Sequence, residues 1–225
     1  LKGGSDLSIS WMLNEPNAAT NSVTLEYSVD GGTSWTTIAS SLPNTGSHNW
    51  LVPSQDTNQA KIRVRATDLA GNEGEAVSEA FSIDSTPPDV PGVTLASGKL
   101  SNSRTVQLNV DCDSDFAKVF LSESAATPDS NSPGWLDCSA LISYEVSSGD
   151  GLKTIYVWSK DSAGNVSTNS TNVSMTLDQT PPVIELTSLN SGVYPAGSTQ
   201  LVTWTITDAY LVAEKLDIYL SEDGG

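Results

Sequence analysis

The sequence predicts an all-β chain of β-sandwich modules that follow one another end to end. First, two motifs recur: Asp-x-Ala-Gly-Asn at 68–72 and 161–165, and Asp-x-Thr-Pro-Pro at 84–88 and 178–182. They return after 93 and 94 positions, which is the length of one small β-sandwich domain. Second, short runs of alternating apolar and polar residues lie between turn residues, and no stretch keeps a helical period. Third, each repeat closes on a double proline, which suits a linker between modules.

The first expected module covers residues 1–86, with the first strand of a complete sandwich missing. Asp30-Gly31-Gly32 supplies residues that accept a positive φ, which predicts a tight hairpin. A last strand is expected after the 68–72 loop, carrying Val77, Phe81 and Ile83. The other strands are predicted where apolar residues alternate, at 7–13, 23–29, 35–38, 50–52 and 62–66.

The second expected module covers residues 87–180, and a stiff linker, Thr86-Pro-Pro-Asp-Val-Pro91, leads into it. Three prolines in five positions restrict the backbone, so the joined modules should adopt a limited set of angles. Alternating apolar residues predict its strands at 106–110, 119–121, 142–146 and 155–157.

The third segment, residues 181–225, aligns without a gap to the first module at an offset of 193. Gly197, Ser198 and Trp204 match Gly4, Ser5 and Trp11. This segment is therefore expected to hold only the N-terminal half of a sandwich. Incomplete sandwiches expose an apolar face and an open strand edge, so homo-oligomerisation by strand addition is an alternative for both ends.

Charge excludes some partners. The chain carries 27 acidic and 10 basic residues, a net charge of −17. Such a surface repels phosphate backbones and anionic membranes, so nucleic-acid binding is not expected. No apolar run is long enough to span a bilayer, so no membrane insertion is expected in this segment. His48 is the only histidine and no nucleophile–base set is visible, so we do not expect an enzyme.

The repeated loop, the proline linker and the opening Gly3-Gly4-Ser5…Ile9-x-Trp11 resemble bacterial immunoglobulin-like and fibronectin type III-like repeats. The resemblance covers nearly the whole chain and implies a tandem array from a large surface adhesin, fibre or other secreted protein. It implies an extracellular or bacterial cell-surface location. It is specific for architecture and says little about activity.

Calcium is the predicted cofactor, at the junctions between modules. In this topology the end of one module should bring carboxylates close to loops at the entry pole of the next. Converging carboxylates repel one another unless a hard cation neutralises them, and similar repeats are known for ions at such joints. The alternative is that each Asp caps its own turn. The candidate ligands are Asp84, Asp89, Asp111, Asp113, Asp115, Asp161, Asp178 and Asp208.

Two further features belong to the second module. Cys112 and Cys138 are expected to form a disulfide that closes an irregular insertion, with a pair of unlinked buried thiols as the alternative. Phe120, Tyr156 and Trp158 alternate with expected core residues and should share the outer face of one sheet. That face would bind a glycan or a protein if exposed; alternatively, the insertion covers it with Trp135.

The sequence thus favours a non-catalytic extracellular repeat region, a semi-rigid stalk of a bacterial surface adhesin or fibre. Its first partners would be the neighbouring repeats of the same chain. Two alternatives remain open. The second module could be a binding module for a cell-surface glycan or protein, or the chain could be an accessory region of a large secreted hydrolase.

Overall fold

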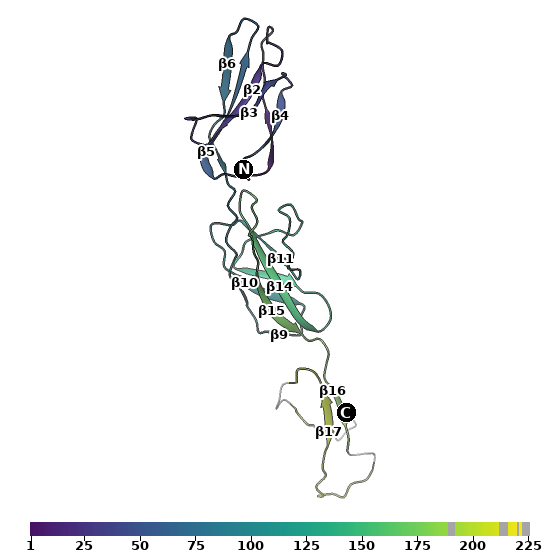
Figure 1. Ribbon diagram of the computed structural model, residues 1–225. Helices are drawn as coiled ribbons and strands as arrows, with labels where there is room; N and C mark the ends of the chain where they lie inside the picture. The colour runs from purple at the N-terminus through teal and green to yellow at the C-terminus, as the bar shows by residue number, and fades with distance from the viewer. Residues whose placement is uncertain (189–191, 212–215, 220, 222–225) are drawn as a thin grey trace.

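The computed structural model describes residues 1–188, 192–211, 216–219 and 221. These residues form strands, turns and loops, and none of them is helical. Figure 1 shows three units in a row, with the first module at one end and strands β16 and β17 at the other. The N-terminus lies at the junction between the first two units (Figure 1). The predicted fold class, all-β with tandem sandwiches of immunoglobulin-like or fibronectin type III-like type, is confirmed.

The first module is a sandwich of two sheets. One sheet pairs β1 with β4, and the other has the order β3-β2-β5-β6, with β7 also pairing with β5. Its buried cluster includes Val23, Leu25, Val52 and Ile83, because alternate residues of these strands face inward. The strands are β1 (Asp6–Ser10), β2 (Val23–Ser28), β3 (Thr36–Leu42), β4 (Ser47–Leu51), β5 (Thr57–Thr67), β6 (Glu73–Val77) and β7 (Phe81–Ile83).

The second module has one more strand on its smaller sheet. That sheet has the order β13-β10-β8, and the larger one has the order β12-β11-β14-β15-β9. The buried cluster between them includes Leu108, Val119, Ile155 and Leu177. The strands are β8 (Val93–Leu95), β9 (Leu100–Ser101), β10 (Thr105–Val110), β11 (Lys118–Ser122), β12 (Leu136–Asp137), β13 (Leu141–Glu145), β14 (Gly151–Lys160) and β15 (Thr171–Leu177).

The last strand of the first module differs from the prediction. The expected single strand through Val77, Phe81 and Ile83 is divided into β6 and β7. Both pair with β5, β6 with its second half and β7 with its first. Ser78 sits at the break, where its hydroxyl accepts from the Ile62 amide at 2.9 Å. The Ser78 side chain thus takes the place of a backbone partner of Ile62, and the expected single strand continues as β7 beside another part of β5.

The third segment forms one antiparallel pair, β16 (Val183–Leu186) with β17 (Trp204–Thr207). Many of its apolar side chains are exposed, including Val183, Ile184 and Leu186 at 59%, 55% and 62%. A single strand pair leaves such a face uncovered, and the division of residues 181–225 as the N-terminal half of a sandwich stays a prediction. The hairpin expected at its end falls on residues 222–225, outside the described residues.

Candidate functional site

Each repeated Asp-x-Ala-Gly-Asn loop is held by its own aspartate. One Asp161 oxygen accepts from the backbone amides of Gly164 at 2.7 Å and Asn165 at 2.8 Å. The other accepts from the Asn165 side-chain amide at 2.8 Å. Asp68 holds Asn72 in the same way, through its backbone amide and its side chain. The glycine of each loop has a positive φ, 87° in the first and 97° in the second, which explains its place in the motif.

The loop of the second module also contacts the end of the first. The Asn165 side-chain amide donates to the Asp84 carbonyl at 3.1 Å, and Asn165 is only 4% exposed. From the other side, Lys2 Nζ donates to the Gly164 carbonyl at 3.3 Å. Asn165 therefore joins its own turn to the last strand of the preceding module.

The linker lies on the second module. Pro88 and Pro91 are buried, and the Ser159 hydroxyl donates to the Asp89 carbonyl at 2.5 Å. A buried proline without an amide proton leaves no donor unsatisfied, so it suits this packed segment. By contrast, Pro181 and Pro182 of the second linker are exposed.

A second pair of aspartates holds the linkers, and the sequence analysis missed it. Asp56 accepts from the Ser85 amide at 2.6 Å and from the Thr86 hydroxyl. Asp150 accepts in the same way from the Gln179 amide at 2.7 Å and from the Thr180 hydroxyl. In both modules the Asp precedes the Thr by 30 positions, a constant spacing that could have revealed the pair. These bonds lower the pKa of both carboxyls, through the threonine hydroxyl first.

Comparison with known proteins gives only distant matches. No protein-family model matches the sequence, and no curated protein matches it either. Among solved structures, the fibronectin(III)-like modules of Clostridium thermocellum CbhA are 17% identical, with a TM-score of 0.40, covering 78% of this chain and 87% of theirs. The chicken CNTN1 FN1–FN3 domains are 16% identical, with a TM-score of 0.47, covering 78% and 64%. A 1.5-MDa bacterial ice-binding adhesin is 18% identical, with a TM-score of 0.38, covering 82% and 63%.

Four of the eight predicted calcium ligands accept hydrogen bonds within their own turns. Asp161 caps its own loop, while Asp84, Asp178 and Asp208 each accept from an amide two residues further on. These carboxylates therefore follow the alternative expected for Asp at turns.

The remaining candidates lie in the loops of the second module. Asp89, Asp111 and Asp113 line a shallow hollow beside Cys112, and Asp115 is exposed nearby. Among the described residues, no three acidic, histidine or cysteine side chains are arranged to hold a metal ion. Calcium binding itself stays a prediction, which calorimetry on chelator-treated protein would test.

The insertion of the second module folds over the predicted aromatic face. A disulfide joins Cys112 to Cys138 at the base of the insertion. Within it, the Trp135 ring lies 5.4 Å from the Phe120 ring, and Lys160 Nζ lies 4.4 Å from the Trp135 ring centroid. Burial beneath the insertion, followed by repulsion from Lys118, lowers the pKa of Lys160.

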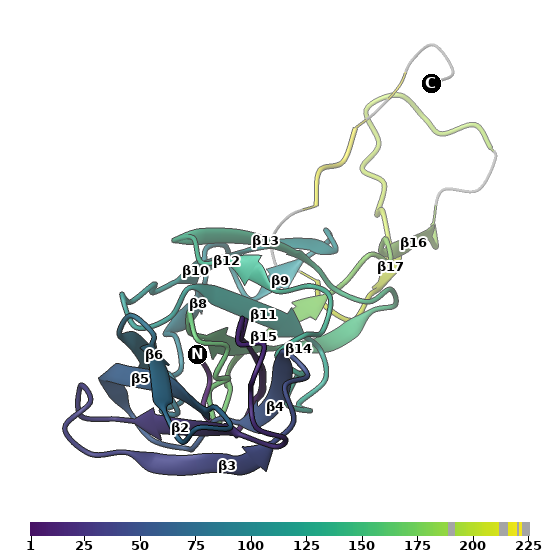
Figure 2. The ribbon, with the colours of Figure 1, turned by 90° about the horizontal axis from the view of Figure 1, so that it is seen from above.

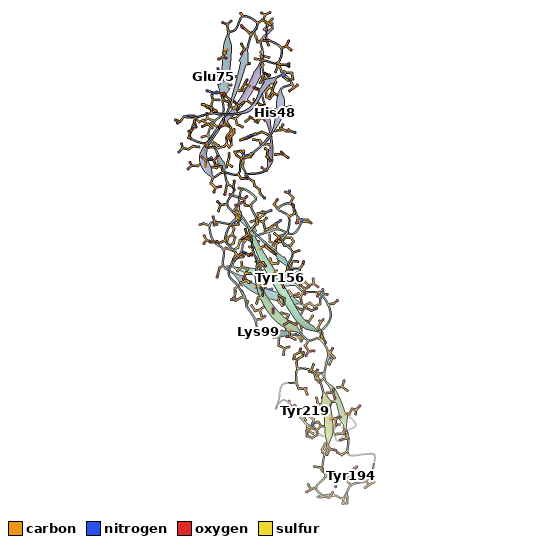
Figure 3. All side chains as sticks on the ribbon, viewed as in Figure 1. His48, Glu75, Lys99, Tyr156, Tyr194 and Tyr219 are labelled. Atoms are coloured by element: carbon orange, nitrogen blue, oxygen red, sulfur yellow. A yellow bond between two sulfur atoms is a disulfide. The ribbon has the colours of Figure 1, made fainter. Side chains whose placement is uncertain are left out.

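The aromatic face is therefore largely covered. Trp158 is 4% exposed, and Phe120, Tyr156 and Trp135 are half-buried. Phe120 and Trp158 are register partners on β11 and β14, as expected from their alternation. Figure 3 shows Tyr156 in the middle of the second module, away from the junction. The insertion thus covers the face with Trp135, which is the alternative given in the sequence analysis. A ligand-binding role for these four residues stays a prediction.

His48, the only histidine, lies away from the residues described above. His48 is half-buried on β4, in register with Ile9 of β1 (Figure 3). In the part of the chain that the structure describes, no helix has the length and apolar character to cross a membrane.

Proposed function

We propose that this chain is a non-catalytic extracellular repeat region that serves as a semi-rigid stalk of a bacterial surface adhesin or fibre. The observation that supports this most directly is the bond from the buried Asn165 side chain to the Asp84 carbonyl. A stalk must keep successive modules at a defined angle, and a buried hydrogen bond across the joint resists bending because breaking it leaves an unsatisfied group.

The other contacts at the junction act in the same direction. Lys2 ties the N-terminus to the 161–165 loop, and the buried Pro88 and Pro91 fix the linker against the second module. The modules thus meet along a packed segment, whereas a free tether would allow them to rotate independently. The disulfide suits an oxidising, extracellular compartment, because thiols are kept reduced in the cytosol.

Replacing Asn165 by Ala tests the stalk proposal. The variant loses the bond across the joint, worth about 1 kcal/mol, and the spread of angles between the first two modules should widen. Small-angle X-ray scattering and residual dipolar couplings on the full chain would measure the angle distribution. Asn72→Ala is the matched control, since the Asn72 side-chain amide donates to Asp68 within its own loop. An unchanged distribution in Asn165→Ala, or a wide one in the parent chain, would contradict the proposal.

The competing binding function depends on the second module. Its aromatic face is covered by the insertion, so recognition would have to use the insertion surface or follow its displacement. A glycan array probed with the full chain separates the two functions. Reproducible binding that is lost in Trp135→Ala would favour the binding module, and no binding would leave the stalk function.

A further inference from the structure

Residues 123–135 of the insertion lie over the outer face of the larger sheet in the second module. They contain no strand and join β11 to β12. The Trp135 ring contacts the Phe120 ring of β11, and Lys160 Nζ of β14 lies 4.4 Å from the centroid of the Trp135 ring. Lys160 Nζ also donates to the Ser130 carbonyl at 2.7 Å. The insertion therefore contacts two adjacent strands of this face.

A buried tryptophan with an unpaired donor lies on the covered face. Trp158 is opposite Phe120 in register and two residues before Lys160, so its side chain leaves β14 on the same side as both. It is 4% exposed, yet it is not part of the apolar cluster between the two sheets. Its buried Nε1–H has no hydrogen-bond partner among the described residues. A buried unpaired donor costs free energy, and opening the insertion would let the indole reach an acceptor.

Among the described residues, few bonds hold the insertion at its base apart from the disulfide. Strand β12 is two residues long and pairs with Lys118 and Val119 at the start of β11. The ion pair between Lys118 and Asp137 is exposed, and exposed ion pairs contribute little to stability. Cys138 follows β12 directly, and its bond to Cys112 closes the insertion covalently. Because Cys112 is exposed, a thiol in solution can reach this bond.

We propose that the Cys112–Cys138 disulfide is a redox switch for the insertion. In the oxidised protein, the closed loop between the two cysteines keeps Trp135 against Phe120 and covers Trp158. Reduction frees the end of the insertion at β12, so that the insertion leaves the outer face and Trp158 becomes exposed. The two sheets keep their own core, because the buried cluster between them does not include Trp158. The switch thus changes one face of the module and leaves the fold in place.

The opening reaction needs a dithiol as the two-electron reductant. A thiolate of the dithiol attacks the exposed Cys112 sulfur, the S–S bond breaks, and the Cys138 sulfur leaves as a thiolate that takes up a proton. The second thiol of the reductant then loses its proton and attacks the reductant sulfur of the mixed disulfide, which releases Cys112 as a thiolate that is also protonated. The products are one oxidised dithiol and two cysteine thiols. The reverse exchange with an oxidised dithiol closes the insertion again.

Hydrogen exchange of the tryptophan indole groups tests the switch in the full chain. The Trp158 Nε1–H should exchange slowly in the oxidised protein, and dithiothreitol without denaturant should speed its exchange about tenfold or more. Nuclear magnetic resonance spectra of nitrogen-15-labelled protein resolve the indole signals, and Trp158→Phe assigns the relevant one. The indole of Trp50, which is buried in the first module, should be unaffected. Backbone amides of β14 and β15 should stay protected, and reoxidation should restore slow exchange.

Two variants separate the cover from the disulfide. Trp135→Ala, with the disulfide intact, should speed exchange of the Trp158 indole because it removes the contacts with Phe120 and Lys160. The double variant Cys112→Ser, Cys138→Ser should exchange fast with and without dithiothreitol, since these are the two cysteines of the chain.

Three results would overturn the proposal. The first is unchanged exchange of the Trp158 indole on reduction or in Trp135→Ala. The second is a simultaneous loss of amide protection in β14 and β15, because the disulfide would then hold the whole module. The third is fast exchange that persists after reoxidation, because the change would then not be a switch.

Discussion

Single carboxylates fix the backbone at several turns of this chain. Asp150 holds the second linker through the Gln179 amide and the Thr180 hydroxyl, and Asp56 holds the first linker in the same way. Only the ionised carboxylate accepts all of these bonds, so the fold lowers the pKa of both groups below the ordinary value of 3.8.

This pKa shift predicts a loss of stability in acid. Because the folded pKa of Asp150 lies below the unfolded one, its contribution is present above about pH 4 and is lost as the pH falls through the folded value. Asp150→Asn should lower the melting temperature at pH 7, and the gap to the parent should close near pH 2. Thermal melts followed by circular dichroism would measure this. A gap that stays constant with pH would show that the carboxylate charge plays no part.

Core residues at matched positions should differ between the modules. Val157 is fully buried, whereas its counterpart Val64 is half-buried and lines a hollow between residues 11–15 and strands β5 and β6. Val157→Ala should therefore cost about 2 kcal/mol of unfolding free energy, and Val64→Ala clearly less. Urea unfolding of both variants checks the difference. Equal costs would contradict the difference in burial between the two valines.

At the level of elements, the insertion depends on its disulfide. Cys112 and Cys138 lie at the base of the insertion. Above them, Trp135 contacts the Phe120 ring and Lys160. Opening the bond releases a loop of 25 intervening residues in the unfolded chain. Loop-closure entropy puts the stabilisation at about 3 kcal/mol.

Replacing both cysteines by serine should remove this stabilisation and loosen the insertion. The unfolding free energy should fall by about 3 kcal/mol, and tryptophan fluorescence should become more accessible to iodide as Trp135 leaves Phe120. Adding Trp135→Phe to the double-serine variant shows whether the change in iodide quenching comes from the Trp135 ring. Unchanged quenching would show that packing alone holds the insertion.

The sequence predicted the elements better than the contacts between them. The alternation of apolar and polar residues located β2, β5, β10 and β14, because successive side chains of a half-buried strand point to the core and to solvent in turn. It could not show that Ser78 breaks the last strand of the first module, since a serine there is compatible with either arrangement.

The site predictions stay untested, but local hydrogen bonds hold several of the carboxylates that the sequence assigned to the joints. The aspartates expected to share a cation mostly accept from nearby amides, as Asp161 does from Gly164 and Asn165. Composition shows that acidic residues are frequent but not which donors surround each one. The Asp56–Thr86 contact, by contrast, could have been predicted, because the same spacing of 30 residues recurs in Asp150–Thr180.

At the scale of the whole molecule, the two linkers differ. Pro88 and Pro91 are buried at the first joint, whereas Pro181 and Pro182 are exposed at the second. In the view from above in Figure 2, which looks along the row of units, the first two modules lie one behind the other and β16 and β17 lie to one side. The first joint should therefore be the stiffer of the two.

Limited proteolysis should reflect this order. Proteinase K, which has broad specificity, is expected to cut first in exposed parts of the third segment, such as those around Tyr210 and Tyr219, and to spare the first linker. Mass spectrometry of early fragments would locate the cuts. Cleavage within residues 84–92 before any cut beyond residue 180 would contradict a stiff first joint.

The chemistry of the first joint has an evolutionary consequence. Asn165 meets a main-chain carbonyl, which every amino acid carries, and not the side chain of a particular neighbour. The preceding unit therefore needs the right backbone path but no special residue at that point. Gene duplication or recombination could insert, delete or exchange units without rebuilding the connection, so arrays of very different length could arise from this one pattern.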